Sequence, residues 1–281
     1  MYYYENENGD NICIGYDTDE YMLKSIDGVD SLKNNITTVK GLYQDGATVI
    51  NTEIEVRDIN LVGMYTANDF SKENLLKVFN PKVKGVLYYI KDDVKRKINC
   101  VVETSPVFKV GSFLHEFQVR LVAHDPYWKD SEDTEVAFAS ITPSFQFPLQ
   151  FATEFELATI DNIKAKDILN DGDVEAPIYI EFIANGPVTN PFIKSANAEI
   201  RLTRLTLVKG DRIVITTDRN NKKVTVYRAD GTIEKGFKYL HYMSTYIQLA
   251  TGTTRFTFGA ETSQENLGII FKFTKRYVGV I

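Results

Sequence analysis

RIVITTDRNNKKVTVY, residues 212–227, contains the pattern that decides the fold. Apolar and polar side chains alternate in RIVITT and again in KVTVY, and the polar turn DRNN separates the two runs. Such alternation is typical of β-strands with one buried face. The same pattern recurs in IYIEF at 178–182, EIRL at 199–202, YIQLA at 246–250, RFTF at 255–258 and IIFKF at 269–273. Many short strands separated by turns predict a β-sandwich or a jelly roll in the second half of the chain.

The first half alternates as well, but its phase changes once. Apolar side chains occupy even positions from 50 to 56 and odd positions from 59 to 61. Because a shift of one residue turns every side chain to the other face, we expect a β-bulge or a sharp bend near Arg57 and Asp58. One helix is predicted at residues 69–79, with Leu75, Leu76 and Phe79 on its apolar face and Pro81 beyond its end.

A second hairpin is predicted around the only basic cluster. The strands GVLYYI at 85–90 and INCVV at 98–102 flank KDDVKRK at 91–97, which we interpret as a protruding, solvated tip. The cations of this tip are candidate assembly contacts: Lys91, Lys95, Arg96 and Lys97.

The 281 residues are enough for two domains, which we place at 1–140 and 141–281. The stretch 136–153 carries no charge, and we expect a linker strand at 141–153. Four apolar side chains of that strand share one side and are expected to be buried against a domain or a neighbouring subunit, which makes them further candidate assembly contacts: Phe145, Phe147, Leu149 and Phe151.

No constellation of catalytic or metal-binding residues is found. His115-Glu116 starts an HExxH-like string, but Val119 stands where the second histidine is needed. Residues 17–28 open like a calcium loop, yet Met22 and Gly28 occupy the positions of the required Gly and Glu. Phosphate-binding, dinucleotide-binding and nucleophile-elbow motifs are absent from the sequence. We therefore expect no enzyme activity, no metal and no cofactor.

Charge and cysteine content narrow the functional class further. The net charge is −6, which argues against nucleic-acid binding by a basic face. Residues 1–140 hold 15 Lys and Arg against 23 Asp and Glu, a balance of −8, so the second half carries +2. Cys13 and Cys100 lie in apolar runs and are expected to be buried free thiols of a protein made in a reducing cytosol. The polar start predicts no signal peptide, and two prolines in the charge-free stretch argue against membrane insertion.

Several segments, in order, resemble the distal tail proteins of siphophages. In the first half these are YENENGDNICIG at 4–15, TEIEVRDINLVG at 52–63, FNP at 79–81 and FQVRLVAHDPYW at 117–128. In the second half they are NDGDVEAPIYIEF at 170–182, LTLVKGDRIVITTD at 205–218 and FKFTKRYVGV at 271–280. The resemblance spans nearly the whole chain.

The resemblance implies a mostly β protein with two parts. An N-terminal β-sandwich-like ring domain, with one helix and a protruding hairpin, would be followed by a galectin-like or carbohydrate-module-like β-sandwich. It also implies a role as a structural protein of the virion tail tip, assembled in the host cytoplasm. Copies would form a ring, usually hexameric, that joins the tail tube protein to the tail-tip or baseplate hub protein. DNA would pass through the ring without specific binding, and residues 1–140 alone would suffice to form it.

Two other functions stay open at this point. A carbohydrate-binding tail module would contact glycans of the host wall, and a receptor-binding protein would be a further partner. The only tryptophan, Trp128, precedes the second half, so tyrosines would have to stack on the sugar: Tyr179, Tyr239, Tyr242 or Tyr246. A wall-degrading tail enzyme is the other alternative, and the lack of a catalytic signature argues against it.

Overall fold

The structure, a computed structural model, describes residues 1–16, 20–66, 69–111, 113–137, 139–143, 158–162 and 165–280. The chain divides into two compact units. Unit 1 consists of residues 1–131 together with 276–281, and unit 2 consists of residues 132–275. The division therefore falls nine residues before the expected one at 140, and the last residues return to the first unit.

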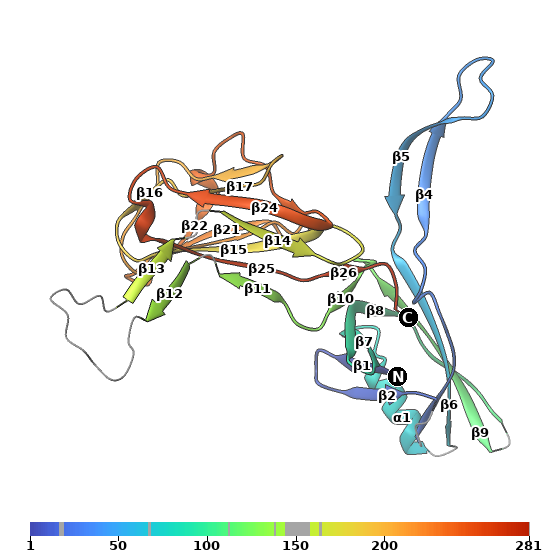
Figure 1. The fold of residues 1–281 in the computed structure, drawn as a ribbon. Helices are drawn as coiled ribbons and strands as arrows, with labels where there is room; N and C mark the ends of the chain where they lie inside the picture. Colours follow the sequence, from blue (N-terminus) through green and yellow to red (C-terminus); the bar gives the residue numbers. More distant parts are fainter. Residues whose placement is uncertain are drawn as a thin grey trace. The chain divides into compact units, whose positions relative to one another are not determined.

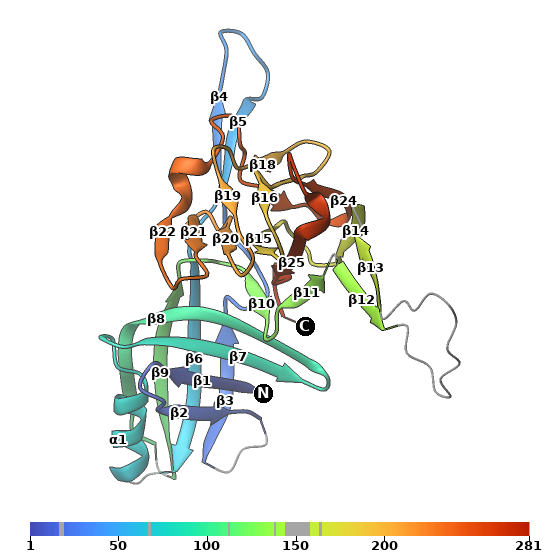
Figure 2. The ribbon, with the colours of Figure 1, turned by 90° about the vertical axis from the view of Figure 1, so that its left-hand side faces the viewer.

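Unit 1 is built on one antiparallel sheet with the strand order β2-β1-β7-β8-β9-β6-β3, to which β10 and β26 add a short ribbon beside β8. The two ends of this order meet, because the amide of Leu23 donates to the carbonyl of Gly15 at 2.7 Å. The sheet thus curls around its own core (Figure 2). Its strands are β1 (Tyr2–Asn6), β2 (Asn11–Ile14), β3 (Tyr21–Asp27), β6 (Arg57–Thr66), β7 (Lys84–Lys91), β8 (Val94–Lys109), β9 (Leu114–Ala123), β10 (Trp128–Asp130) and β26 (Arg276–Tyr277).

Helix α1 (Asp69–Val78) confirms the one predicted helix. Leu75 is fully buried, as are Val78 and the following Phe79, whose ring stacks on Tyr4 at 4.7 Å. Leu76, expected on the same face, is exposed instead. The reason is geometric: positions 75, 78 and 79 share one side of a helix, whereas position 76 is turned away by about 100°.

The basic cluster lies at the end of the predicted hairpin, and residues 91–95 are exposed as expected of a solvated tip, whereas Arg96 and Lys97 are half-buried. β7 and β8 pair without interruption up to Lys91 opposite Val94, so Asp92 and Asp93 alone form the turn. Asp92 adopts a positive φ of 51°, as tight two-residue hairpin turns require. Lys95, Arg96 and Lys97 therefore lie within β8.

A further hairpin projects from unit 1 and is formed by β4 (Asn34–Val39) and β5 (Thr48–Ile54). Every side chain of both strands is exposed, and Figure 1 shows the pair extending away from β6. The predicted shift in the alternation of apolar side chains near Arg57 coincides with the boundary between β5, which is exposed, and β6, which is half-buried. In β6, Arg57, Ile59 and Leu61 face the core.

Unit 2 is a two-layer β-sandwich, and the mostly β architecture is thereby confirmed. Phe256 of one layer contacts Phe271 of the other at 5.0 Å between ring centroids. The first layer contains β11 (Thr134–Ala137), β25 (Leu267–Phe273), β15 (Ala176–Ala184), β20 (Arg212–Thr216), β21 (Lys223–Tyr227), β22 (Ile233–Lys235) and β23 (Gln248–Leu249). The second contains β14 (Ala165–Asn170), β24 (Gly252–Gly259), β17 (Phe192–Lys194) and β18 (Glu199–Arg201). Smaller elements are β12 (Ala139–Pro143), β13 (Ala158–Asn162), β16 (Val188–Thr189), β19 (Thr206–Leu207), η1 (Gly236–Tyr239) and η2 (Gln264–Asn266).

Candidate assembly surfaces and a sheet-face pocket

The arm, residues 34–54, is the largest projecting feature of unit 1 (Figures 1 and 2). At its tip Leu42 and Tyr43 are 89% and 97% exposed. Further large apolar side chains are exposed along it and at its base: Ile36, Val39, Val49, Ile50, Ile54 and Val56. A soluble protein rarely leaves so much apolar surface on a hairpin with two unpaired edges unless another molecule covers it.

The feet of the arm, residues 28–33 and 55–58, are held close together. The amide of Glu55 donates to the carbonyl of Lys33 at 3.0 Å, and the two side chains form an ion pair of 2.7 Å. Gly28 has a φ of 84°, and a Cβ there would lie 1.9 Å from the carbonyl oxygen of Asp58. Only glycine can occupy this position without moving the second foot.

Arg57, the first residue of β6, belongs to the second foot and binds the first foot through its guanidinium group. The residue is only 3% exposed. Its Nη1 donates to the carbonyls of Gly28 and Val29 at 2.7 and 2.9 Å, and its Nε donates to that of Pro126 at 2.7 Å. Its Nη2 donates to the carbonyl of Val278. Burial lowers the pKa of Arg57, an effect that the charge of Asp30 opposes.

The four basic residues predicted as assembly contacts divide into two pairs. Lys91 and Lys95 are exposed. Arg96 and Lys97 are half-buried, because Arg96 donates to the carbonyl of Gly279 at 2.6 Å and Lys97 donates to that of Ser131 at 2.9 Å. Arg96 and Lys97 are therefore engaged within unit 1. The four apolar linker residues Phe145, Phe147, Leu149 and Phe151 lie outside the described residues.

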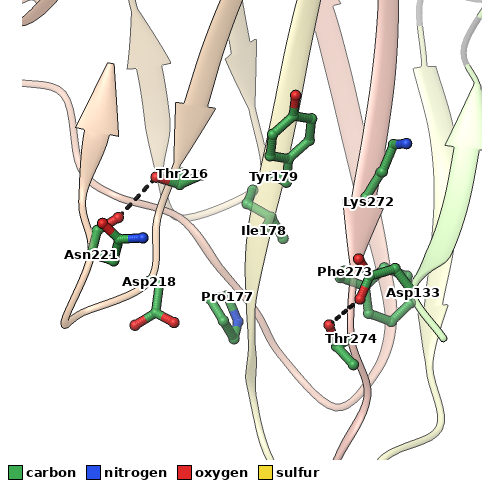
Figure 3. Close-up of a pocket in the computed structure, with 10 residues that line it drawn as sticks. All are labelled: Asp133, Pro177, Ile178, Tyr179, Thr216, Asp218, Asn221, Lys272, Phe273 and Thr274. Atoms are coloured by element: carbon green, nitrogen blue, oxygen red, sulfur yellow. Dashed lines mark hydrogen bonds between the residues drawn. The ribbon is translucent and has the colours of Figure 1, made fainter. Parts of the chain in front are cut away.

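Unit 2 has a shallow pocket of about 190 Å³ on the outer face of its first layer (Figure 3). Tyr179 and Lys272 project from neighbouring strands there, and Lys272 pairs with Glu135 at 2.7 Å, which raises the pKa of the Lys272 ammonium. The lining residues are Asp133, Pro177, Ile178, Tyr179, Thr216, Asp218, Asn221, Lys272, Phe273 and Thr274. The mixture of carboxylates, an ammonium group, hydroxyls and an aromatic ring offers hydrogen bonds to a polyhydroxylated ligand.

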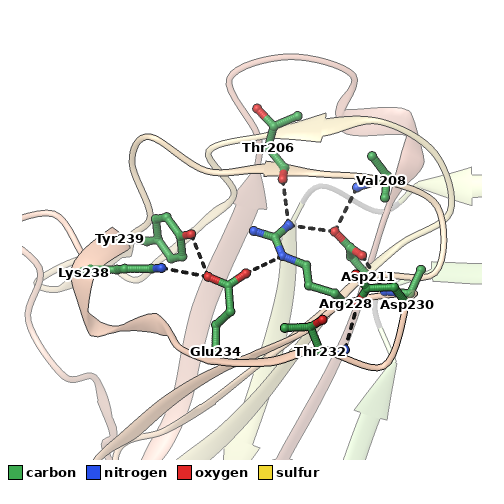
Figure 4. Close-up of polar contacts among 10 residues, drawn as sticks. Thr206, Val208, Asp211, Arg228, Asp230, Thr232, Glu234, Lys238 and Tyr239 are labelled. Atoms are coloured by element: carbon green, nitrogen blue, oxygen red, sulfur yellow. Dashed lines mark hydrogen bonds and ion pairs between the residues drawn. The ribbon is translucent and has the colours of Figure 1, made fainter.

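Arg228 organises a polar cluster elsewhere in unit 2 (Figure 4). It bonds Asp211 and Glu234 at 2.8 Å each, and Glu234 also accepts from Lys238 at 2.8 Å and from the Tyr239 hydroxyl at 3.0 Å. Led by the bonds from Lys238 and Arg228, these contacts lower the pKa of Glu234 to about 2. Because every partner is satisfied by another member of the cluster, we assign it a role in holding turns together.

The other sequence candidates do not come together as a site. His115 packs edge-on against Tyr65 and accepts a hydrogen bond from the Gly111 amide. Cys100 is buried, and burial raises the pKa of its thiol to about 12, whereas Cys13 is half-buried. Among the described residues, no group of three or more His, Cys, Asp or Glu could hold a metal ion. In the same part of the chain, no helix is long and apolar enough to span a membrane.

Sequence reasoning missed the arm and the role of Arg57. The exposed apolar positions of 48–56 were a signal for the arm, but alternation alone does not reveal whether the apolar side meets the chain's own core. The contacts of Arg57 join residues up to 221 positions apart, so no local pattern could indicate them.

Two family models match the chain in succession. A phage tail protein RIFT-related domain matches residues 15–123, and the C-terminal domain of a siphovirus-type tail component matches residues 171–277. No curated protein sequence is significantly similar to the chain.

Solved structures share the fold at low sequence identity. One is the Dit (gp 19.1) protein of SPP1, described as a paradigm of the hub adsorption apparatus in phages that infect Gram-positive hosts. It has a TM-score of 0.71 and 9% identity, over 98% of this chain and 99% of that one. Two others are chains of the phage p2 baseplate in its activated conformation. The structure with Ca has a TM-score of 0.52 and 10% identity, over 99% of both chains. The structure with Sr has a TM-score of 0.52 and 11% identity, over 100% of both chains.

Proposed function

Since the chain belongs to the distal tail proteins of siphophages, and so is a structural component of the virion tail, we propose that its copies close into a ring at the end of the tail tube. The ring is hexameric and joins the tail tube protein to the tail-tip hub protein. DNA passes through it without specific binding, and the chain performs no catalysis.

The exposed apolar arm is the observation that carries this proposal. A ring closes through head-to-tail contacts, which require two different complementary surfaces on each copy. The arm supplies one such surface, and its tip residues Leu42 and Tyr43 would be covered by the next copy. Lys91 and Lys95, exposed at the β7–β8 turn, are proposed to orient the contact against an acidic neighbour.

The test is the oligomeric state of the full chain, measured by light-scattering chromatography at low and high salt. We expect the wild type to form rings and the double variant Leu42→Ser with Tyr43→Ser to stay monomeric. The matched control is Tyr242→Ser with Met243→Ser, which removes two similarly exposed apolar side chains from unit 2 and should leave the ring intact. A wild type that is monomeric at every concentration, or an arm variant that still forms rings, contradicts the proposal.

We place ring formation in unit 1, which differs from the expectation for residues 1–140 alone. Residues 276–280 pack into unit 1, so a ring-forming fragment must contain them. A chain in which residues 132–275 are replaced by a short Gly/Ser linker should therefore form rings more readily than residues 1–140. Equal ring formation by both fragments would contradict this placement.

A carbohydrate-binding role for unit 2 is the second candidate, and the pocket at Tyr179 is the observation that favours it. Titration of host-wall glycans into the wild type and Tyr179→Ala tests it. Binding that Tyr179→Ala weakens supports a sugar site, whereas the absence of binding to any wall glycan removes this candidate.

A further inference from the structure

The segment Arg276–Val280, which we call the return segment, is built into unit 1. β26 pairs with β10, placing Trp128 opposite Tyr277 and Lys129 opposite Arg276. Val280 is 4% exposed and belongs to the core of unit 1. Gly279 packs against Asp30 in the first foot of the arm, and a Cβ on it would lie 2.6 Å from the Asp30 carbonyl oxygen.

Two arginines donate hydrogen bonds to backbone carbonyls of this segment. Arg96 of β8 donates to the carbonyl of Gly279, and its guanidinium lies over the Tyr277 ring at 3.6 Å from the centroid. Arg57 donates to the carbonyl of Val278. A planar guanidinium binds several acceptors at once, which a lysine ammonium at the end of a flexible chain does not reproduce.

The return segment and the arm therefore share contacts at the feet. Arg57 bonds the return segment at Val278 and the first foot at Gly28 and Val29, and it is itself a residue of the second foot. Gly279 touches the neighbouring residue of the first foot, Asp30. Trp128, from the strand paired with the return segment, donates its indole N–H to the same Val29 carbonyl at 3.0 Å.

We propose that the return segment is a positioning element for the arm: when it is seated, it fixes Arg57 and the two feet, and when it is displaced, the arm is released from unit 1 as a loosely held hairpin. Arg57 and Gly279 are the positioning residues. This coupling links the seating of the return segment to the rigidity of the arm. It does not require that the arm bind any particular molecule, and so it does not depend on ring formation.

Hydrogen exchange of the full chain, read by peptide, tests the coupling directly. The variant Gly279→Ala places a Cβ against the backbone of Asp30 and so forces the return segment and the first foot apart, while the sequence of both feet is unchanged. We expect amides of the feet, 28–33 and 55–58, to exchange at least about tenfold faster, together with those of 276–280, while β7 and unit 2 are unchanged. The matched control is Gly268→Ala in β25, where the nearest atom to the new Cβ would be 3.6 Å away, and it should leave the feet protected.

A second variant tests the coupling without adding any atom next to the feet. A chain lacking residues 276–281 cannot seat the segment, and the same local increase in exchange is expected at the feet. Unchanged exchange at the feet in this chain overturns the proposal, and so does a uniform increase through β7 and β8, because the effect would then be global unfolding of unit 1. Oligomeric state is measured in parallel. Faster exchange at the feet in a protein that never forms rings supports the coupling and counts only against the proposed function.

Discussion

Replacing Arg57 by methionine gives the most direct measure of what the buried guanidinium contributes to unit 1. Methionine keeps an unbranched chain of similar length but removes all four hydrogen bonds to backbone carbonyls. A hydrogen bond from a charged donor contributes about 1.5 kcal/mol at the lower end, so four bonds contribute about 6 kcal/mol. Burying the charge costs part of this, as the lowered pKa of Arg57 indicates. We therefore expect Arg57→Met to reduce the free energy of unfolding of unit 1 by about 4 kcal/mol.

The assay is chemical denaturation followed by tryptophan fluorescence. Trp128 is the only tryptophan in the chain and is fully buried in unit 1, so its emission reports on that unit alone. Arg120→Met is the matched control in the same unit. The Arg120 side chain is half exposed and forms ion pairs with Glu103 and Asp58, so its loss should cost less than about 1 kcal/mol. An Arg57→Met chain no less stable than Arg120→Met would refute this reasoning.

Three further outcomes follow from the same contacts. Since the pKa of Glu234 is lowered to about 2 from an ordinary 4.5, its contribution to stability is complete above pH 4.5 and is lost as pH falls toward 2; thermal melting of Glu234→Gln should accordingly depend less on pH in that window than melting of the wild type. The buried Cys100 thiol, with a pKa near 12, should react with a thiol reagent only after denaturation, and a Cys100→Ala chain that loses no native reactivity would agree. Phe147→Asp should lower solubility or ring yield, as measured by sedimentation and chromatography, and unchanged yields would count against a buried linker strand.

Alternation of side chains was enough to predict the β architecture, because it reflects burial against the chain's own core. In β15 and β20, every second side chain enters the core of unit 2, as the pattern of RIVITT and IYIEF indicates. In β5 the same kind of pattern has no core behind it, and Ile50 and Ile54 are exposed. Hydrophobic periodicity does not distinguish a strand face that packs against the chain's own core from an exposed strand face that binds another molecule.

Whether a candidate assembly residue is accessible depends on contacts with residues far away in the sequence. Lys91 and Lys95 are accessible, as expected of a basic cluster. Arg96 and Lys97 look the same in sequence, yet they bind the carbonyls of Gly279 and Ser131. The positive φ of Asp92 allows a tight turn at Asp92 and Asp93. The residues that follow, including Arg96 and Lys97, are therefore part of β8.

The insertion of unit 2 between β10 and β26 has a mechanical consequence. A domain at the end of a chain transmits any pulling force through a single peptide connection, whereas unit 2 is anchored by two, at residues 131–132 and 275–276. The anchoring strands are paired with each other, and the Tyr277 hydroxyl donates to Asp130 at 3.3 Å, so a load on one is shared with the other. A cut at 275–276 would leave unit 2 covalently joined to unit 1 through residues 131–132, whereas after a cut at 131–132 only the non-covalent contacts of β26 would hold it.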